Sequence, residues 1–323
     1  MKFQLIGGLR MLNNGKSGKA RFFCFSMALA LGGCAQLPSK DAALPVLAPT
    51  QATQAPPPIA KRAPKIGLAL GGGAARGFAH VGAIQVFEEA GLRPSFVTGT
   101  SAGSLVAAIY ASGKTGAQLQ QVSESMEEVS IADWTLPLFN RGMLRGEALA
   151  RYVNKQVDSR LIENLPIPLG IVATDLNSGL AVLFQRGDTG TAVRASSAVP
   201  ALFQPVKIAG SEYVDGGLVS PVPVRYARQM GAELVIAIDI SSEPENNPAN
   251  DTLQVLLQTF AIMGKSINSF ELQGADVVVR PAINGLSSSD FSSRKKLIEA
   301  GRQAMLQMLP QIRRKMVELA RAP

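Results

Sequence analysis

Histidine is nearly absent from this chain of 323 residues, in which His80 is the only one. Serine hydrolases of the α/β type carry their catalytic histidine after the nucleophilic serine in chain order. His80 instead precedes Ser101, the serine that the motifs below single out. The sequence therefore argues against a conventional Ser-His-Asp triad, and an activated serine in this chain needs a carboxylate as its base.

Cysteine is also scarce, with Cys24 and Cys34 the only two. Cys24 lies in an amino-terminal apolar run that we expect to be cleaved off, which leaves Cys34 alone in the mature chain. The mature chain is then expected to form neither an internal disulfide nor a thiolate metal site.

Acidic residues are missing from positions 1–33, where five basic residues accompany an apolar run from Phe22 to Leu31 that leads into Gly32-Gly33-Cys34. This pattern predicts a lipoprotein signal peptide over 1–33 and acylation of Cys34. The apolar run is too short for a permanent transmembrane helix, and an uncleaved anchor is the alternative. Lipoproteins that resemble this one, with Ala35 rather than Asp after the cysteine, are sorted to the outer membrane. We therefore expect a lipid-anchored protein in the envelope of a Gram-negative-type bacterium, on the periplasmic side of the outer membrane rather than at the inner membrane.

The formal charge of +8 comes mostly from that first segment. Without it, 27 basic residues remain against 24 acidic ones, a formal charge of +3. The rest of the sequence has no basic patch with interleaved aromatic residues, so we expect no nucleic-acid partner.

Residues 34–64 are dominated by Ala, Pro, Gln and Thr and include three consecutive prolines, Pro56 to Pro58. Such a segment cannot bury a core, so it predicts an extended tether between the lipid anchor and a folded domain. About 30 residues at roughly 3.1 Å each would reach about 90 Å. The folded domain is expected over 65–323.

Apolar runs alternate with helical periodicity through this domain. The predicted strands span 66–70, 95–98, 169–173, 181–184, 234–238 and 277–280. The predicted helices span 78–90, 105–111, 117–129, 223–230, 253–270 and 295–319, the last broken or kinked at Pro310. This alternation predicts an α/β sandwich with a mostly parallel central sheet and helices on both faces.

Two glycine-containing loops follow the first two predicted strands: 71–77 and Gly99-Thr100-Ser101-Ala102-Gly103. In a parallel sheet both lie at the carboxyl ends of neighbouring strands, where a nucleophile and backbone N–H groups can face one substrate atom. The small residues Gly99 and Gly103 suit the tight strand-to-helix turn that exposes a nucleophilic Ser101. A pentapeptide of this kind is a weak signal alone, but its place between a strand and a helix strengthens it.

The first loop has a rival interpretation as a dinucleotide-binding motif. In that motif the second strand ends near an acid that holds the ribose, but here it ends in Gly99-Thr100-Ser101. The interpretation that remains is an oxyanion hole formed by backbone N–H groups of this loop. Arg76 either orients this loop, attracts an anionic head group, or forms a plain surface salt bridge.

Three aspartates follow strand-like runs and are candidates for the base: Asp175, Asp215 and Asp239. Asp215 is favoured because the two glycines behind it allow a tight turn and leave the carboxylate room, although a turn-forming Asp-Gly is the alternative. His80 is better explained as a packed or hydrogen-bonded helix residue than as a catalyst.

Three motifs occur in order: 68–82 around the glycine loop, Gly99-Thr100-Ser101-Ala102-Gly103, and Asp215-Gly216-Gly217. Over about 66–228 the chain resembles the patatin-like phospholipases, particularly the bacterial branch similar to the neuropathy-target-esterase group. The loop glycines are spaced G-x-G-x-x-x-G, one residue longer than the usual pattern.

This resemblance implies a patatin fold with a Ser101–Asp215 dyad and no metal or cofactor. It also implies that the glycine loop, through N–H groups of Gly71, Gly72 and Gly73, is the oxyanion hole. The expected function is a serine acyl hydrolase of the phospholipase or lysophospholipase type that cleaves fatty-acyl esters of membrane lipids. Alternatives are a thioesterase or acyltransferase with the same dyad, or a noncatalytic lipid-binding envelope protein. The run 134–139 is either a lid or acyl-binding surface, or a buried core segment.

Overall fold

The computed structural model describes residues 62–126, 133, 142–241, 244, 250–283 and 291–321, all within the unit from Pro58 to Pro323. The expected signal peptide, Cys34, nearly all of the expected tether and the run 134–139 lie outside the described residues.

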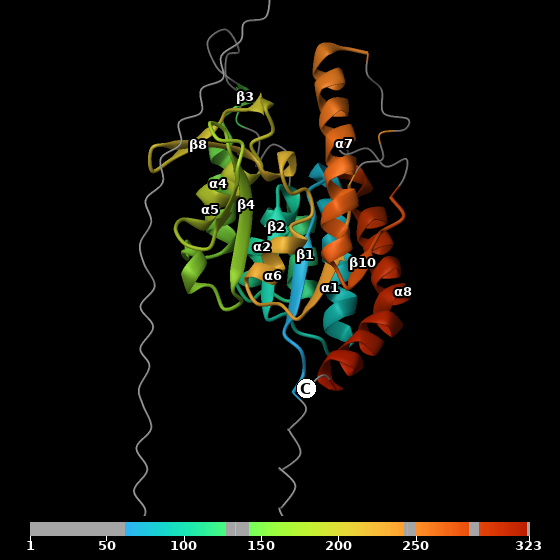
Figure 1. Ribbon diagram of the computed structural model, residues 1–323. Coiled ribbons are helices and arrows are strands. Elements are labelled where there is room, and N and C mark those ends of the chain that lie inside the picture. The colour runs from blue at the N-terminus through green and yellow to red at the C-terminus, as the bar shows by residue number, and fades with distance from the viewer. Residues whose placement is uncertain are drawn as a thin grey trace, which may run out of the picture. The chain divides into compact units, whose positions relative to one another are not determined.

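An eight-stranded sheet forms the centre of the described domain, in the order β10-β9-β1-β2-β4-β8-β7 with β5 also paired to β4 (Figure 1). Five strands run parallel: β1 (Ile66–Leu70), β2 (Phe96–Thr100), β4 (Leu169–Asp175), β9 (Leu234–Ile238) and β10 (Val277–Val279). Three are antiparallel to a neighbour: β5 (Ala181–Phe184), β7 (Val206–Ile208) and β8 (Ser211–Asp215). A separate pair joins β3 (Gly142–Leu144) to β6 (Ala201–Phe203).

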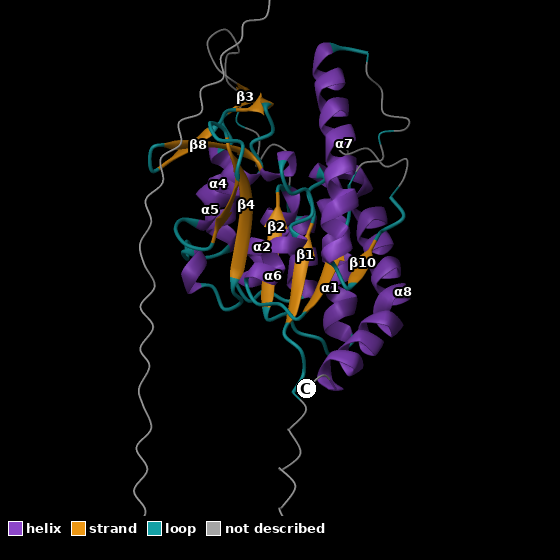
Figure 2. Ribbon diagram, in the orientation of Figure 1, coloured by secondary structure: helices purple, strands orange, loops and turns teal. Residues whose placement is uncertain are grey.

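Helices pack on both faces of the sheet (Figure 2), as alternate residues of β1 show. Leu68 and Leu70 point into a core with α1 (Phe78–Glu89), α2 (Ala102–Ala111) and α8 (Arg294–Arg321). Three further helices contribute to that core: α3 (Gly116–Glu124), α4 (Glu147–Gln156) and α5 (Thr189–Ser196). Ala69 instead contacts the smaller cluster beneath α6 (Val224–Gln229). The long helix α7 (Thr252–Glu271) follows β9. Because both faces are covered, β1 and β9 are buried along their whole length.

The predicted α/β fold with a mostly parallel sheet is confirmed, and so are the strands and helices that form its centre. Several bounds differ from the prediction by one to three residues, and the largest difference is in the helix predicted over 117–129, which ends at Glu124. The last helix is not broken at Pro310, which lies inside α8.

The uninterrupted helix α8 packs closely on α1. A Cβ atom on Gly82 would lie 1.8 Å from the Ile298 carbonyl oxygen, and one on Gly301 would lie 1.9 Å from that of Ala79. The two backbones therefore touch at a glycine from each helix. Such tertiary contact can outweigh the intrinsic preference of proline to end a helix.

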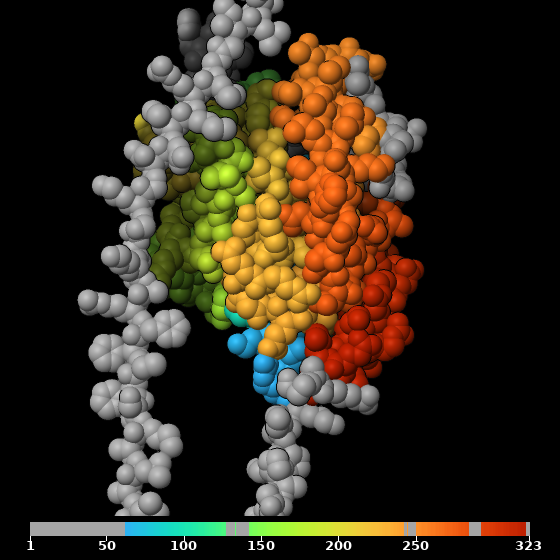
Figure 3. All heavy atoms as spheres, in the orientation of Figure 1, coloured from blue at the N-terminus to red at the C-terminus, as the bar shows by residue number. Residues whose placement is uncertain are grey.

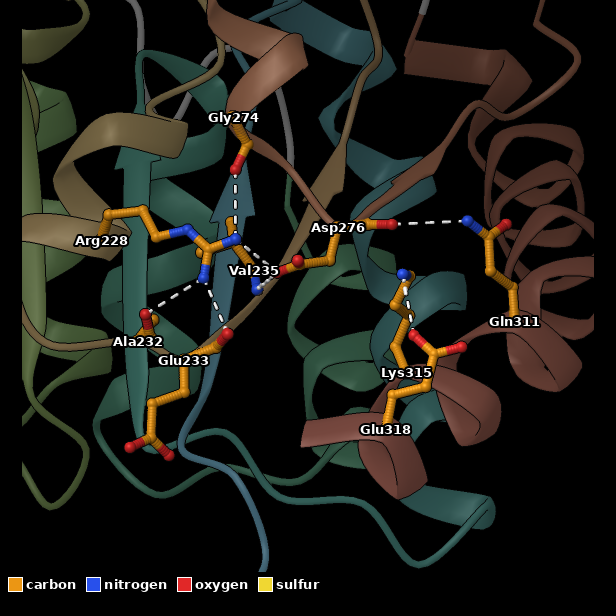
Figure 4. Close-up of polar contacts among 9 residues, drawn as sticks. All are labelled: Arg228, Ala232, Glu233, Val235, Gly274, Asp276, Gln311, Lys315 and Glu318. Carbon is orange, nitrogen blue, oxygen red and sulfur yellow. Dashed lines mark hydrogen bonds and ion pairs between the residues drawn. The ribbon is translucent and has the colours of Figure 1, made fainter. Parts of the chain in front are cut away.

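Arg228 connects several elements at the amino ends of the parallel strands, which is the end of the sheet away from Ser101 (Figure 4). Its guanidinium donates to the carbonyl oxygens of Ala232, Glu233 and Gly274 and to the carboxylate of Asp276. Asp276 also accepts from the N–H of Val235 at 2.7 Å. These contacts join α6, β9 and β10 far from the Ser101 end.

Among the described helices, none is both long and apolar enough to cross a membrane.

Candidate active site

Ser101 occupies the tight turn between β2 and α2. Its φ of 52° and ψ of −125° are unusual for a residue with a side chain, and they direct the hydroxyl away from the strand. The neighbouring glycines are required by close approach. A Cβ on Gly99 would lie 2.6 Å from the Gly103 carbonyl oxygen, and one on Gly103 would lie 2.1 Å from that of Leu70.

The sheet brings Ser101 and Asp215 together because two strands meet end to end along one edge of β4. β2 runs parallel to β4 and ends with Thr100 opposite Val172. β8 runs the other way and ends with Asp215 opposite Ala173, the next residue of β4. Both lie on the edge of β4 opposite β5, which pairs with Val172 and Ala173 from the other side. As a result the Ser101 hydroxyl donates to Asp215 Oδ2 at 2.7 Å.

Asp215 is almost fully buried, with 6% of its surface exposed. Burial raises its pKa from 3.8 to about 6, against the lowering effect of hydrogen bonds from the Ser101 hydroxyl and the Gly217 N–H. The second of these bonds reaches Oδ1 at 2.7 Å and leaves Oδ2 for the serine. The carboxylate is therefore a stronger base than an exposed aspartate and still ionised at neutral pH.

The other two candidate bases have other contacts. Asp175 ends β4 and accepts hydrogen bonds from the N–H groups of Asn177 and Ser178, which lower its pKa. Asp239 follows β9 and pairs with Arg280 at 3.2 Å. Neither is bonded to Ser101 in the described structure.

His80 is fully buried on α1, and burial lowers its pKa to about 4. Its Nε2 lies 2.8 Å from the Gly71 carbonyl oxygen, so Nε2 carries the proton and donates it. This is the packed, hydrogen-bonded role that the sequence favoured. Its effect is to fix the first residue of the glycine loop.

The glycine loop lies beside Ser101, since a Cβ on Gly72 would be 3.2 Å from the Ser101 Cβ. Two of the three expected oxyanion donors, however, are already engaged. The Gly71 N–H donates to the Ile238 carbonyl oxygen at 3.1 Å, and the Gly72 N–H donates to that of Pro221 at 2.9 Å. Of the three expected oxyanion donors, Gly73 is the one that remains, because its N–H donates to no backbone carbonyl within the described residues. The sequence did not reveal these bonds because both acceptors belong to distant segments.

Arg76 is buried, with 9% of its surface exposed. Its Nε donates to the Gly73 carbonyl oxygen at 3.3 Å, which supports the expected role in orienting the loop. Burial lowers its pKa to about 10, partly offset by the charge of Asp239, so the guanidinium remains a cation under ordinary conditions.

Ser196 on α5 is a site residue that the sequence analysis missed. Its hydroxyl accepts from the Ser101 N–H at 2.9 Å and donates to the Val172 carbonyl oxygen at 2.6 Å. It thereby links the nucleophile turn to β4 from a fully buried position. The sequence around Ser196 is a run of small residues, which permits close packing. It does not indicate that the Ser196 hydroxyl bonds the Ser101 N–H.

The described domain has an α/β fold in which a serine on a strained strand-to-helix turn is hydrogen-bonded to a buried carboxylate. Residues 68–228 match the patatin-like phospholipase family, so this part of the chain is a patatin-like phospholipase domain. A domain of this family implies carboxylic ester hydrolase activity, and the resemblance inferred from the three motifs is confirmed.

Relatives support the same assignment. An uncharacterized NTE family protein of Mycobacterium tuberculosis is 36% identical over 189 residues, which cover 58% of this chain and 52% of that protein. Patatin-like phospholipase domain-containing protein 6 of Homo sapiens is 34% identical over 190 residues, 56% of this chain and 14% of that protein. The chain thus spans about half the length of the mycobacterial relative and a small part of the human one.

The crystal structure of VipD from Legionella pneumophila has a similar fold. The two structures superpose with a TM-score of 0.53 over 77% of this chain and 67% of VipD, at 15% sequence identity. At that identity the similarity concerns the fold alone.

Proposed function

We propose that this protein is a serine acyl hydrolase that cleaves fatty-acyl esters of membrane lipids with the Ser101–Asp215 dyad. The observation that carries the proposal is the 2.7 Å hydrogen bond from the Ser101 hydroxyl to the Asp215 carboxylate. Asp215 is buried and its pKa is raised to about 6, which suits a general base at neutral pH. The patatin-like domain and the named relatives support the choice of a lipid ester.

Acylation begins when Asp215 Oδ2 takes the proton of the Ser101 hydroxyl and the serine oxygen attacks the ester carbonyl carbon. The carbonyl π electrons move to oxygen and form a tetrahedral oxyanion. Collapse of this intermediate breaks the ester bond, and the departing alcohol takes the proton held by Asp215. The acyl group then remains on Ser101.

Deacylation repeats these steps with water as the nucleophile. Asp215 takes a proton from the water as it attacks the acyl carbonyl, and returns that proton to Ser101 when the acyl bond breaks. The products are a fatty acid and the regenerated dyad.

The oxyanion is proposed to bind at the glycine loop. Gly72 lies against Ser101, and Gly73 carries the N–H of the expected set that is not engaged by another backbone group among the described residues. The amino end of α2, which begins directly after Ser101, adds a favourable positive potential. His80 and Arg76 hold the loop through the carbonyl oxygens of Gly71 and Gly73, so neither contact occupies the Gly73 N–H.

The experiment compares hydrolysis of phosphatidylcholine and lysophosphatidylcholine by the wild type and Ser101→Ala. We expect the variant to lose at least about 10³-fold in kcat while its circular dichroism stays unchanged. Ser112→Ala, at the other end of α2, is the matched control because the Ser112 hydroxyl donates to the Ile109 carbonyl oxygen and, among the described residues, to no group of the site. Wild-type protein that releases no fatty acid, or Ser101→Ala protein that retains full activity, would refute the proposal.

We also propose that Cys34 is acylated and anchors the domain to the periplasmic face of the outer membrane. Support comes from the apolar run Phe22–Leu31, the Gly32-Gly33-Cys34 sequence and the proline-rich segment that follows. An anchor of this kind would keep the domain within reach of bilayer lipids.

A further inference from the structure

Helix α7 presents an apolar face to solvent. Four large side chains on this face are between 46% and 73% exposed: Met263, Val255, Ile262 and Phe270. Their spacing places them on one side of an α-helix, because residues separated by seven, eight or fifteen positions lie near the same angle. Thr259 and Ser266 are the exposed residues between them on that side, and neither is charged.

A comparison with α8 shows that this face is unusual for a surface helix of this protein. Ten of the 28 residues of α8 are charged, whereas α7 has only Lys265 and Glu271 among its 20 residues. A helix that only borders water normally presents its charged side to it. On α7 the exposed side that carries Val255, Ile262, Met263 and Phe270 has no charged residue, and the exposed Lys265 flanks it. An exposed apolar row of this kind is the pattern of a surface that a membrane or another molecule covers.

The helix stands at the end of the domain that holds Ser101. Figure 1 shows its amino-terminal half rising past the carboxyl ends of β1 and β2, and Figure 3 shows it along the viewed face with no other described element over it. Its inner side packs on the segment that follows Asp215. A Cβ on Gly264 would lie 3.7 Å from Pro221, and Glu271 accepts from the Ser220 hydroxyl at 3.0 Å.

Pro221 also connects this helix to the site, because its carbonyl oxygen accepts the Gly72 N–H. The segment from Asp215 to Pro221 therefore lies between α7 and the catalytic loops. A surface that binds α7 would therefore lie one segment away from the loops that hold Ser101 and Gly72.

We propose that the apolar face of α7 docks this protein onto a lipid bilayer, which brings the acyl ester to Ser101. This inference rests on the proposed function, because a lipid ester held in a bilayer must be reached from its surface. An uncharged helix face with Val, Ile, Met and Phe inserts into the boundary between head groups and acyl chains, where apolar side chains are buried without displacing ions.

The test places a single environment-sensitive fluorophore on the full chain. Cys24 and Cys34 are the only cysteines, so Cys24→Ser and Cys34→Ser remove both and also prevent lipidation. Ile262→Cys then carries the label on α7, and Val317→Cys carries it on α8. The two native side chains are similarly exposed, at 54% and 49%.

On addition of vesicles of phosphatidylcholine and phosphatidylglycerol, we expect the label at position 262 to shift to the blue and gain about twofold in emission. The label at position 317 is expected to stay unchanged. Absence of a response at 262, or equal responses at both positions, would overturn the proposal. A response at 262 that follows protein concentration without vesicles would assign this face to a second copy and also overturn it.

A second measurement uses activity in the same Cys34→Ser background. Ile262→Ser combined with Met263→Ser is expected to slow hydrolysis of vesicle phospholipid about tenfold and to leave hydrolysis of a soluble short-chain ester unchanged. Unchanged hydrolysis of vesicle lipid would contradict the docking role. If the wild type cleaves no ester at all, the proposed function fails, while the fluorophore still reports whether α7 meets the bilayer.

Discussion

Ser101 and Asp215 are both held in states that oppose folding. Ser101 has a positive φ, which costs a residue with a side chain about 1–3 kcal/mol. Asp215 keeps a carboxylate in a buried place, where its hydrogen-bond donors among the described residues are the neutral hydroxyl of Ser101 and the N–H of Gly217. Surrounding contacts, including the Ser196 hydroxyl, hold both in position. Such strain is expected where a structure is prepared for chemistry.

Asp215→Asn is expected to stabilise the protein and to inactivate it. The rise in pKa from 3.8 to about 6 means that the ionised carboxylate opposes folding by about 3 kcal/mol at pH 8. This penalty is absent below pH 3.8, where the carboxyl is protonated in both states, and it grows as pH rises toward 6. An amide removes the charge but keeps the shape and the Gly217 hydrogen bond.

Urea denaturation of Asp215→Asn and wild type at pH 8 and pH 4 measures this effect. We expect the variant to be more stable at pH 8, with the difference nearly gone at pH 4, and its kcat to fall about 10²–10⁴-fold. A variant less stable than the wild type at pH 8, with intact ellipticity, would show that burial of the charge costs nothing.

The pH dependence of activity should report the same carboxyl group. Because the base must be ionised, kcat/KM for a soluble ester is expected to fall about tenfold per pH unit below an apparent pKa near 6 and to be level above it. His80, with its pKa lowered to about 4, should add nothing in this range. A bell-shaped profile with its acid limb near pH 4 would point to an ordinary exposed carboxylate instead.

Ser196→Ala tests a residue that positions the nucleophile without touching substrate. The change leaves the Ser101 N–H and the Val172 carbonyl oxygen without a shared partner, which should cost about 1–3 kcal/mol in stability. We expect kcat to fall by about tenfold with KM unchanged, because the turn loses its anchor. Ser197→Ala is the matched control, since the Ser197 hydroxyl has no hydrogen-bond partner among the described residues. Equal effects of the two changes would assign Ser196 a packing role only.

At the scale of elements, the crossing of α1 and α8 depends on two glycines. Gly82→Ala places a methyl group 1.8 Å from a backbone oxygen, so the helices must separate, and we expect a loss of about 1–3 kcal/mol in stability. Gly264→Ala on α7 is the contrasting variant. Its methyl group would meet only Pro221 at 3.7 Å, and alanine should stabilise that helix by about 0.5–1 kcal/mol. Thermal unfolding of both variants measures the difference, and a neutral Gly82→Ala would contradict the packing described for this crossing.

The central strands and helices could be predicted because they depend on local patterns. The apolar runs at β1 and β9, and the small residues around Ser101, indicate their structures from sequence alone. The short strands β3, β6 and β7 could not be predicted in this way. Each has three residues, as β10 does, but none is an unbroken run of β-branched residues like that of β10, and each depends on its partner strand.

The candidate site also has one part that local sequence predicts and one part that depends on distant segments. Ser101 and Asp215 stand in recognisable motifs, so sequence suffices to nominate them. The bonds from Gly71 and Gly72 to the Ile238 and Pro221 carbonyl oxygens, and the bond from the Ser101 N–H to the Ser196 hydroxyl, join residues more than 90 positions apart. Long-range contacts of this kind are set by the fold and leave no trace in local spacing.

At the scale of the whole molecule, the proposed anchor predicts a clear difference between the two cysteines. Cys34→Ser should abolish incorporation of labelled palmitate and shift the protein from the membrane to the soluble fraction, because the acylated residue is lost. Cys24→Ser is the matched control, since Cys24 lies within the expected signal peptide and should change neither result. Palmitate labelling that survives Cys34→Ser would contradict the anchor.

The dyad itself is tested most directly by the rate at which a fluorophosphonate labels the full-length protein at pH 8, in wild type, Ser101→Ala and Asp215→Asn. An activated serine should be labelled in the wild type, not labelled in Ser101→Ala, and labelled about 10²-fold or more slowly in Asp215→Asn. Labelling of Asp215→Asn at the wild-type rate would contradict the assignment of Asp215 as the base. Labelling of Ser101→Ala would show that the reactive serine lies elsewhere.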